Sequence, residues 1–316
     1  MDEYKEKYCT IDQAYEKVTT DGYCVIKGVL NNEEIENAKH GLWDTLYNIT
    51  RNFENPIKKN DPKSWKTYLE LKPIHSMLLQ NCEIGHAQFF WDIRQNENVV
   101  NTFSKIWKVE PKDLLVSFDG LSFHVPPEVT KEGWYEGNSW FHTDQAPNKK
   151  EFTCVQGMVS LYDINKGDAT LRVLEKSCKY HDTIFDINQV DSNSNWYEYQ
   201  ENEMKYFEDN NCKPVRVLAK AGDLILWDSR TAHHGIEPIK EREKQNFRAV
   251  TYVCMTPRYM IDEKNLRKKK AAFGDKRMTT HWPHKIKLFS KIKKDLNICE
   301  IIKPKLTNLG KKLAGF

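Results

Sequence analysis

Apolar and polar residues follow two different periods along the chain, and the period changes near residue 110. Up to that point most apolar residues recur at helical spacing, and Asn31 with the acids behind it is typical of a helix start. After it, short apolar runs alternate with turn-forming residues. The N-terminal pattern predicts a helix over Ile11–Lys17, a strand over Tyr23–Leu30, a helix from Asn31 to about Tyr47, a loop over Arg51–Ser64 and a helix over Trp91–Trp107.

The later part of the chain reads as short strands joined by irregular loops. A polar stretch, Asp182–Asn211, interrupts the series and predicts a helical or loop insertion. Short strands of this kind are typical of a sandwich or jelly roll, which buries a site between two sheets. The expected strands are Leu114–Phe118, Phe152–Tyr162, Leu171–Leu174, Pro214–Leu218, Leu224–Trp227 and Phe247–Met255.

Composition places the chain among ordinary globular proteins. No apolar run approaches the ~18 residues of a membrane-spanning helix, and the polar residues Met1–Lys5 are not followed by the apolar segment of a signal peptide. We therefore expect a soluble, intracellular protein, located in the cytoplasm, that is a monomer or a homodimer. The scattered cysteines lack a C-x-x-C pair, which predicts reduced thiols and not a disulfide framework or a zinc site.

Positive charge is concentrated near the C-terminus. The formal net charge is only +3, but residues 263–316 hold 16 Lys and Arg against 4 Asp and Glu. Such asymmetry can mark a surface for nucleic acid or for acidic membranes. No nucleic-acid motif accompanies the charge, so we favour a solvated, lysine-rich pair of helices and keep nucleic-acid binding as the alternative.

The residues with the clearest chemistry are His142 and Asp144. Residues two apart on an extended segment share a face, so both side chains can reach one ion. On its own the pair could equally lie in a surface turn, where Asp144 accepts hydrogen bonds from the neighbouring backbone.

A second histidine follows on a strand led by Gly222 and Asp223. His233 and His234 are adjacent, and neighbours on a strand point to opposite faces, so only one of them can join the same ion. Its distance from Gly222 favours His233, and His234 stays open. Two imidazoles and one carboxylate on one side of a metal are the arrangement of non-haem Fe(II) oxygenases.

Arg248 is flanked by Phe247 and Ala249, so it is expected on a largely buried strand. Burying an arginine without a partner is costly, and its guanidinium matches a carboxylate with two parallel hydrogen bonds. The partner could be an internal Asp or Glu. Beside a His-x-Asp and a distant His, a bound dicarboxylate becomes the favoured partner.

Three aromatic residues, Trp140, Phe141 and Trp227, flank these candidates. Core packing is favoured for them over a role as pocket walls. Arg230 either pairs with Asp228 or holds an anionic group of a substrate, and the sequence leaves both open.

Together, Trp140–Gln145, Gly222–Gly235 and Asn246–Arg248 resemble the phytanoyl-CoA dioxygenase family, as does the start of the chain from Asp21 to Leu30. The resemblance covers roughly Asp21 to Arg258. It implies a fold that is mainly β with flanking helices (α+β), built on a double-stranded β-helix, a cupin-like jelly roll. On this basis we expect one domain over 1–316, with a mostly helical support (1–110), the β-helix core (111–258) and a basic C-terminal extension (259–316).

The resemblance also implies a reaction and its cofactors. It predicts an Fe(II)- and 2-oxoglutarate-dependent dioxygenase that uses O₂ and hydroxylates a small organic substrate, releasing succinate and CO₂. His142, Asp144 and His233 would bind the iron, Arg248 would bind the far carboxylate of 2-oxoglutarate, and Gln156 would line the cosubstrate pocket. Relatives that halogenate have a small residue in place of the carboxylate, so Asp144 favours hydroxylation.

Two alternatives remain at this stage. The chain could be a catalytically inactive jelly-roll protein that only binds its ligand. It could also be an oxygenase that modifies nucleic acid or protein through the basic C-terminal region.

Overall fold

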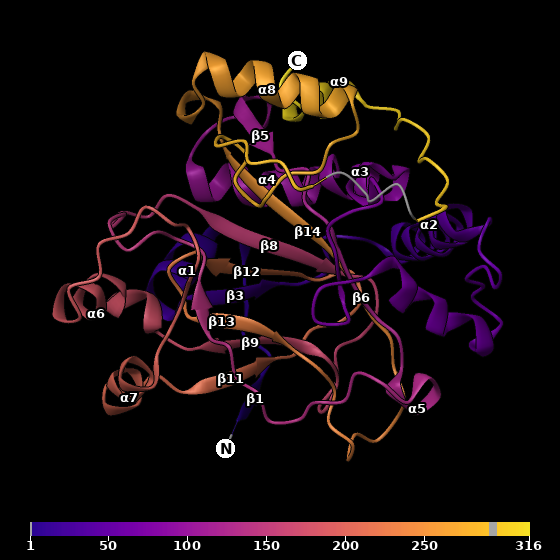
Figure 1. Ribbon diagram of the computed structural model, residues 1–316. Helices are drawn as coiled ribbons and strands as arrows, with labels where there is room; N and C mark the ends of the chain where they lie inside the picture. Colours follow the sequence, from indigo (N-terminus) through magenta and orange to yellow (C-terminus); the bar gives the residue numbers. More distant parts are fainter. Residues whose placement is uncertain (1, 291–295) are drawn as a thin grey trace.

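Two β-sheets face each other at the centre of the protein (Figure 1). The computed structural model describes residues 2–290 and 296–316. In this part of the chain the larger sheet has the strand order β2-β3-β12-β8-β14-β6-β4, with β5 paired to the end of β14. The smaller sheet has the order β1-β11-β9-β13-β7-β10. Neighbouring strands are antiparallel except for β1 with β11 and β2 with β3.

The strand bounds follow the predicted pattern closely in the second half of the chain. The larger sheet contains β2 (Tyr8–Cys9), β3 (Tyr23–Ile26), β4 (Leu78–Leu79), β5 (Leu114–Val116), β6 (Leu121–His124), β8 (Val155–Ser160), β12 (Leu224–Asp228) and β14 (Arg248–Pro257). The smaller sheet contains β1 (Glu3–Lys5), β7 (His142–Thr143), β9 (Thr170–Leu174), β10 (Tyr197–Glu198), β11 (Pro214–Val217) and β13 (His233–Ile236).

Helices surround the sheets and cover the outer face of the larger one (Figure 1). The α-helices are α1 (Ala14–Asp21), α2 (Asn32–Thr50), α3 (Gln88–Arg94), α4 (Glu97–Trp107), α5 (Pro127–Thr130), α6 (His181–Ile187), α7 (Glu201–Asp209), α8 (Glu263–Gly274) and α9 (Asn308–Leu313). Short 3-10 helices are η1 (Ile11–Gln13), η2 (Pro62–Leu71), η3 (Ile84–His86), η4 (Pro111–Asp113), η5 (Ser177–Tyr180) and η6 (Arg258–Met260).

The larger sheet is buried on both faces. On its inner face, side chains such as Met158 and Ile225 pack against side chains of the smaller sheet such as Val173. Its outer face packs against the helices through side chains such as Val159 and Leu226. Since both faces are covered, β8 and β12 are buried along their whole length and are mostly apolar, with Gln156, Ser160 and Asp228 as their polar residues. The expected fold, a jelly-roll core with flanking helices, is confirmed.

Three local expectations were wrong. The strand predicted over Tyr23–Leu30 ends at Ile26, because the chain turns through Gly28, which has a left-handed φ of +60°. The helix predicted over Trp91–Trp107 is two helices, because Asn96 caps a new one by accepting hydrogen bonds from the N–H groups of Asn98 and Val99. The predicted loop over residues 51–64 ends early, because η2 begins at Pro62.

The predicted insertion over Asp182–Asn211 is helical, with α6 and α7 lying beside the smaller sheet (Figure 1). The basic C-terminal region forms α8 and α9, but residues 291–295 of it lie outside the described part of the chain. The division at residue 111 stays a proposal, although β1 to β4 show that the N-terminal part also contributes to both sheets. All eight cysteines are free thiols. Among the described residues, no helix is both long and apolar enough to cross a bilayer.

Candidate metal centre

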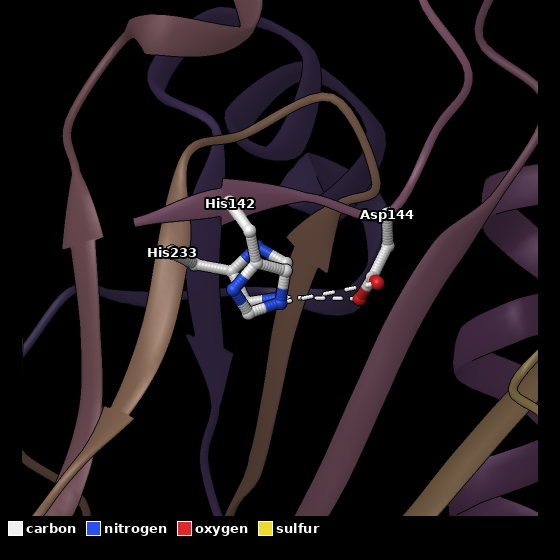
Figure 2. Close-up of side chains that lie close together, drawn as sticks. All are labelled: His142, Asp144 and His233. Atoms are coloured by element: carbon white, nitrogen blue, oxygen red, sulfur yellow. Dashed lines mark ion pairs between the residues drawn. The ribbon is translucent and has the colours of Figure 1, made fainter. Parts of the chain in front are cut away.

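Three side chains from two distant segments of the chain converge on the inner side of the smaller sheet. His142, Asp144 and His233 each offer one ligand atom, and these atoms all lie within 4.8 Å of one another. In Figure 2 the two imidazoles lie against each other and Asp144 faces them from the side. The extended segment at β7 thus brings His142 and Asp144 to one point, as their spacing predicted. Metal binding by the three stays a prediction.

Backbone carbonyls fix the orientation of both imidazoles. Nδ1 of His142 lies 3.2 Å from the carbonyl oxygen of Trp140, and Nδ1 of His233 lies 2.8 Å from that of Thr231. A carbonyl oxygen only accepts, so Nδ1 donates in each ring and Nε2 keeps its lone pair. Burial, and next His233, lowers the pKa of His142 to about 4. Nε2 of each ring therefore faces Asp144, and it is the nitrogen that would bind an ion held between the three side chains.

The carboxylate of Asp144 is held from several sides. Its Oδ2 accepts a hydrogen bond from Nε2 of Gln156 (2.8 Å) and lies 3.3 Å from Nε2 of His233. Its Oδ1 lies 3.9 Å from Nε2 of His142. Burial by itself would raise the pKa of Asp144, but the neighbouring histidines, His281 first, outweigh burial and hold this pKa well below its usual range. The carboxylate is therefore ionised, which a metal ligand requires.

His234 lies on the opposite face of β13. Its ring packs edge-on against Phe141 with a centroid distance of 4.6 Å, and its Nε2 lies 3.4 Å from Nη1 of Arg172. The alternation of side chains along a strand separates it from His233, as expected. His233 is thus the histidine that reaches the cluster.

Arg248 is buried on β14 without an acidic partner. Its Nη1 donates to the carbonyl oxygen of Thr170 (3.0 Å), and its other contacts are the sulfur atoms of Met77 (3.6 Å) and Met158 (3.7 Å). Its Nε has no hydrogen-bond partner, and no Asp or Glu of the described residues forms an ion pair with it. Burial lowers the pKa of this guanidinium. The sequence-based alternative of an internal carboxylate partner therefore does not hold within the described residues.

The cluster and Arg248 line one cavity of about 330 Å³. Gln156 also lines it, and its hydrogen bond to Asp144 places it beside the metal cluster. Trp140 and Trp227 form part of the wall, and the Trp227 indole N–H lies 3.2 Å from Nε2 of His233. Phe141 instead packs in a separate apolar cluster. Core packing was therefore the better expectation for Phe141 and the wrong one for Trp140.

Arg230 is accounted for by an internal partner. Its Nη2 lies 2.7 Å from Oδ2 of Asp228, whose side chain is fully buried. Arg230 does not line the cavity. Of the two roles that the sequence left open, the ion pair with Asp228 is therefore the one observed.

Sequence reasoning missed several polar residues of the cavity wall, among them Gln80, Asp119 and His281. Each lies in a segment whose pattern gave no sign of the site. His281 belongs to the C-terminal extension, which we had interpreted as a charged surface. Contacts between such distant segments depend on tertiary packing and have no local signal.

The donor set fits an iron centre with a dicarboxylate beside it. Two neutral imidazoles and an ionised carboxylate are the protein ligands of mononuclear non-haem Fe(II) sites. A buried guanidinium with a free edge matches the far carboxylate of a bound 2-oxo acid, because the fork geometry of arginine suits carboxylate oxygens.

Comparisons with known proteins agree with this geometry. A sequence profile of the family described as phytanoyl-CoA dioxygenase (PhyH) matches residues 18–237. The protein named "Ava biosynthesis cluster protein O" from Aspergillus versicolor is 30% identical over 210 residues, which are 64% of this chain and 65% of that protein. The chain thus spans just under two thirds of the length of this relative.

Solved structures share the fold at low sequence identity. The hypothetical protein JW0805 from Escherichia coli superposes with a TM-score of 0.64 at 16% identity, over 98% of this chain and 82% of that chain. EvdMO1 superposes with a TM-score of 0.50 at 16% identity, over 78% of this chain and 50% of that chain.

Proposed function

Because the chain belongs to the phytanoyl-CoA dioxygenase family, whose members use Fe(II), 2-oxoglutarate and O₂, we propose that it is an Fe(II)- and 2-oxoglutarate-dependent oxygenase that hydroxylates a small organic molecule. The observation that carries the proposal is one cavity lined by both a His-Asp-His cluster and an arginine without a carboxylate partner. The first fits the metal, and the second fits the cosubstrate.

His142, Asp144 and His233 would hold the iron. The carbonyls of Trp140 and Thr231 keep the two imidazoles in the tautomer that presents Nε2. The Gln156 amide orients the carboxylate of Asp144 by donating to Oδ2. These contacts preorganise the ligand atoms, so little ordering is needed when the metal binds.

Arg248 would bind the distal carboxylate of 2-oxoglutarate. Its aliphatic surroundings, including Met77 and Met158, keep water from its guanidinium and strengthen the pairing. The bound metal and cosubstrate supply, with O₂, an oxidant that can remove a hydrogen atom from a C–H bond, with release of succinate and CO₂. The protein contributes the orientation of the substrate within the cavity.

The outcome of the oxidation is proposed to be hydroxylation. Asp144 fills the position that must be small in relatives that transfer a halide, so the carboxylate leaves no room for a halide at the metal. An inactive binding protein is the weaker account, because it would not need three ligand atoms and an unpaired buried guanidinium in one cavity.

One observation favours a macromolecular substrate instead, namely the positive charge of residues 263–316. Part of that charge is unavailable for such contacts, since Lys269 is fully buried and donates to the carbonyl oxygen of Val116. Binding of RNA or DNA at low salt that weakens steeply as salt increases would support this second candidate.

The direct test is turnover of 2-oxoglutarate. We expect the Fe(II)-loaded chain to release succinate slowly by itself and faster with a substrate, and Asp144→Ala to abolish release. Asp209→Ala, which removes an exposed carboxylate on α7, is the matched control and should leave release unchanged. Equal succinate release from wild type and Asp144→Ala would refute the proposal.

A further inference from the structure

The cavity of the metal centre continues into a second one of about 500 Å³. Both are lined by Gln80, Asp119, Asp144, Trp196 and His281, whereas Arg248 lines only the first. The end of the first cavity near Arg248, where 2-oxoglutarate is proposed to bind, is therefore separate from the end that the two cavities share (the shared end). The shared end lies next to Asp144 and is the natural position for the substrate.

Asp119 brings a carboxylate to this shared end without a full set of partners. The residue is only 5% exposed. Its Oδ1 accepts the N–H of Gly120 (2.7 Å) and lies 3.5 Å from Nε2 of Gln80, whereas its Oδ2 has no donor among the described residues. Arg94 donates to the main-chain carbonyl oxygen of Asp119 (2.7 Å) and not to its carboxylate. Burial raises the pKa of Asp119 to about 6.

His281 offers a second polar atom without a partner at the same end. Its Nε2 is buried and makes no hydrogen bond within the described chain. Two hydrogen bonds fix the segment that carries it. The main-chain N–H of Thr279 donates to the carbonyl oxygen of Phe118, and the N–H of Phe118 donates to the Thr279 hydroxyl (3.0 Å each). Phe118 is the residue before Asp119. His281 and Asp119 are thus held in place by the same short connection.

Nε2 of His281 is buried without a partner among the described residues, which is unfavourable unless a ligand satisfies it. Oδ2 of Asp119 is left without a protein donor at the same end of the cavity. Trp196, which is 50% exposed, lines both cavities, and Ile74, also 50% exposed, lines the first. The rest of the second cavity is largely polar, with Asn193, Ser194 and Thr280 among its lining residues. The shared end therefore combines a carboxylate oxygen, a ring nitrogen and an aromatic surface.

We propose that Asp119 and His281 form a substrate subsite that binds a hydrogen-bond-donating group, a hydroxyl or an ammonium, on a molecule that also presents an apolar group to Trp196 and Ile74. This inference rests on the proposed function, since it places the substrate between the subsite and the metal. Asp119 Oδ2 accepts from the donor group, and Nε2 of His281 is its second partner. Trp196 and Ile74 contact the apolar group.

The test uses four matched probes: 2-phenylethylamine, 2-phenylethanol, the methyl ether of that alcohol, and 3-phenylpropanoate. Their binding is measured calorimetrically on the chain loaded with redox-inert Zn(II) and 2-oxoglutarate. We expect the amine or the alcohol to bind at least about tenfold more tightly than the ether and the carboxylate. A preference for the amine identifies an ammonium, and equal binding of amine and alcohol identifies a hydroxyl.

Two variants separate the subsite from the metal centre. Asp119→Asn keeps an acceptor for the Gly120 N–H and should remove most of the preference for donors, while Asp209→Asn should retain it. His281→Phe should weaken the donor probes without affecting the ether. Zn(II) and 2-oxoglutarate should bind Asp119→Asn and Asp209→Asn like wild type. For His281→Phe the donor probes are compared with the ether on the same variant, because His281 also lowers the pKa of Asp144.

Three results would overturn the inference: the ether or carboxylate binding as tightly as the donors, no probe binding while 2-oxoglutarate still binds, or Asp119→Asn keeping the full preference. Failure of 2-oxoglutarate to bind the wild-type chain would be a different result, because it would refute the proposed function itself.

Discussion

Arg248 leaves an electrostatic imbalance in the cavity, since no Asp or Glu of the described residues forms an ion pair with it. Its charge is buried, its Nε lacks a partner, and two of its neighbours are thioether sulfurs. A protein that binds nothing there would be more stable with an apolar side chain of similar size. The imbalance is therefore best explained by a ligand that completes the pair.

We predict opposite effects of Arg248→Met on stability and on binding. Without ligands the variant should be about 1–3 kcal/mol more stable to unfolding, because a buried unpaired charge is removed. Binding of 2-oxoglutarate should weaken by about 30-fold or more, because a buried charge-assisted pair is lost. Denaturant unfolding and calorimetry measure the two effects. A destabilised variant that still binds 2-oxoglutarate normally would show that the arginine is purely structural.

The two adjacent histidines of β13 provide a matched pair. His233→Ala should abolish metal binding, because it removes one of three ligand atoms, whereas His234→Ala should retain it, because His234 points to Phe141 and Arg172 on the other face. Equilibrium dialysis with Fe(II) under anaerobic conditions measures this. Loss of metal in the His234→Ala variant, with the protein folded, would contradict the assignment.

At the scale of elements, Asp223 joins the start of β12 to the N-terminal part of the chain. Its Oδ1 accepts the N–H of Gly28 (2.8 Å), and its Oδ2 accepts the Tyr8 hydroxyl (2.8 Å) and the Lys220 N–H (2.7 Å). The strand that follows lies between β3 and β8 and leads to His233. Order at the metal centre thus depends on a carboxylate that lies far from it.

We therefore expect Asp223→Ala to lower the free energy of unfolding by about 2–4 kcal/mol, because two main-chain N–H groups and the Tyr8 hydroxyl lose a charged acceptor. Tyr8→Phe removes only one of the three hydrogen bonds and should cost about 1 kcal/mol. Urea denaturation of both variants gives the comparison. Equal effects of the two substitutions would show that the backbone contacts contribute little.

The sequence predicted the elements that local patterns determine. Extended spacing at β7 was enough to expect His142 and Asp144 on one face. That His233 joins them was implied by the resemblance to the family, because local spacing separates His233 from His234 but does not place either beside His142. The break between α3 and α4 was missed, because the aromatic periodicity continues across Asn96 and hides its capping role. Asp119 and His281 were missed as well, because their proximity is created by the packing of a C-terminal segment.

At the scale of the whole molecule, several imidazoles are buried in their neutral form. Burial is the first cause in each case, and it lowers the pKa of His86 to about 3 and the pKa values of His124 and His284 to about 4. These rings lie in different parts of the fold and outside the metal cluster. Acid should therefore destabilise the entire protein and not one local region.

The direction follows from proton binding. In the unfolded chain a histidine has its ordinary pKa near 6.5, so below that pH the unfolded state binds protons that the folded state excludes. Stability should be constant above about pH 6.5 and should fall, by up to about 1.4 kcal/mol per pH unit for each ring, as the pH decreases toward 4. Denaturant unfolding at pH 7.5 and pH 5.5 tests this. His86→Gln should reduce the difference, and His40→Gln on the exposed side of α2 serves as its control.

The central claim is that one cavity holds both iron and 2-oxoglutarate, and an anaerobic titration of the chain with Fe(II) in the presence of 2-oxoglutarate tests it most directly. The signal is the weak visible band that arises when the 2-oxo acid binds the metal through two oxygens. We predict this band in the wild-type chain, its absence in His142→Ala, and a much weaker band in Arg248→Met at the same 2-oxoglutarate concentration. No band from a folded wild-type chain, or an unchanged band in His142→Ala, would contradict the account.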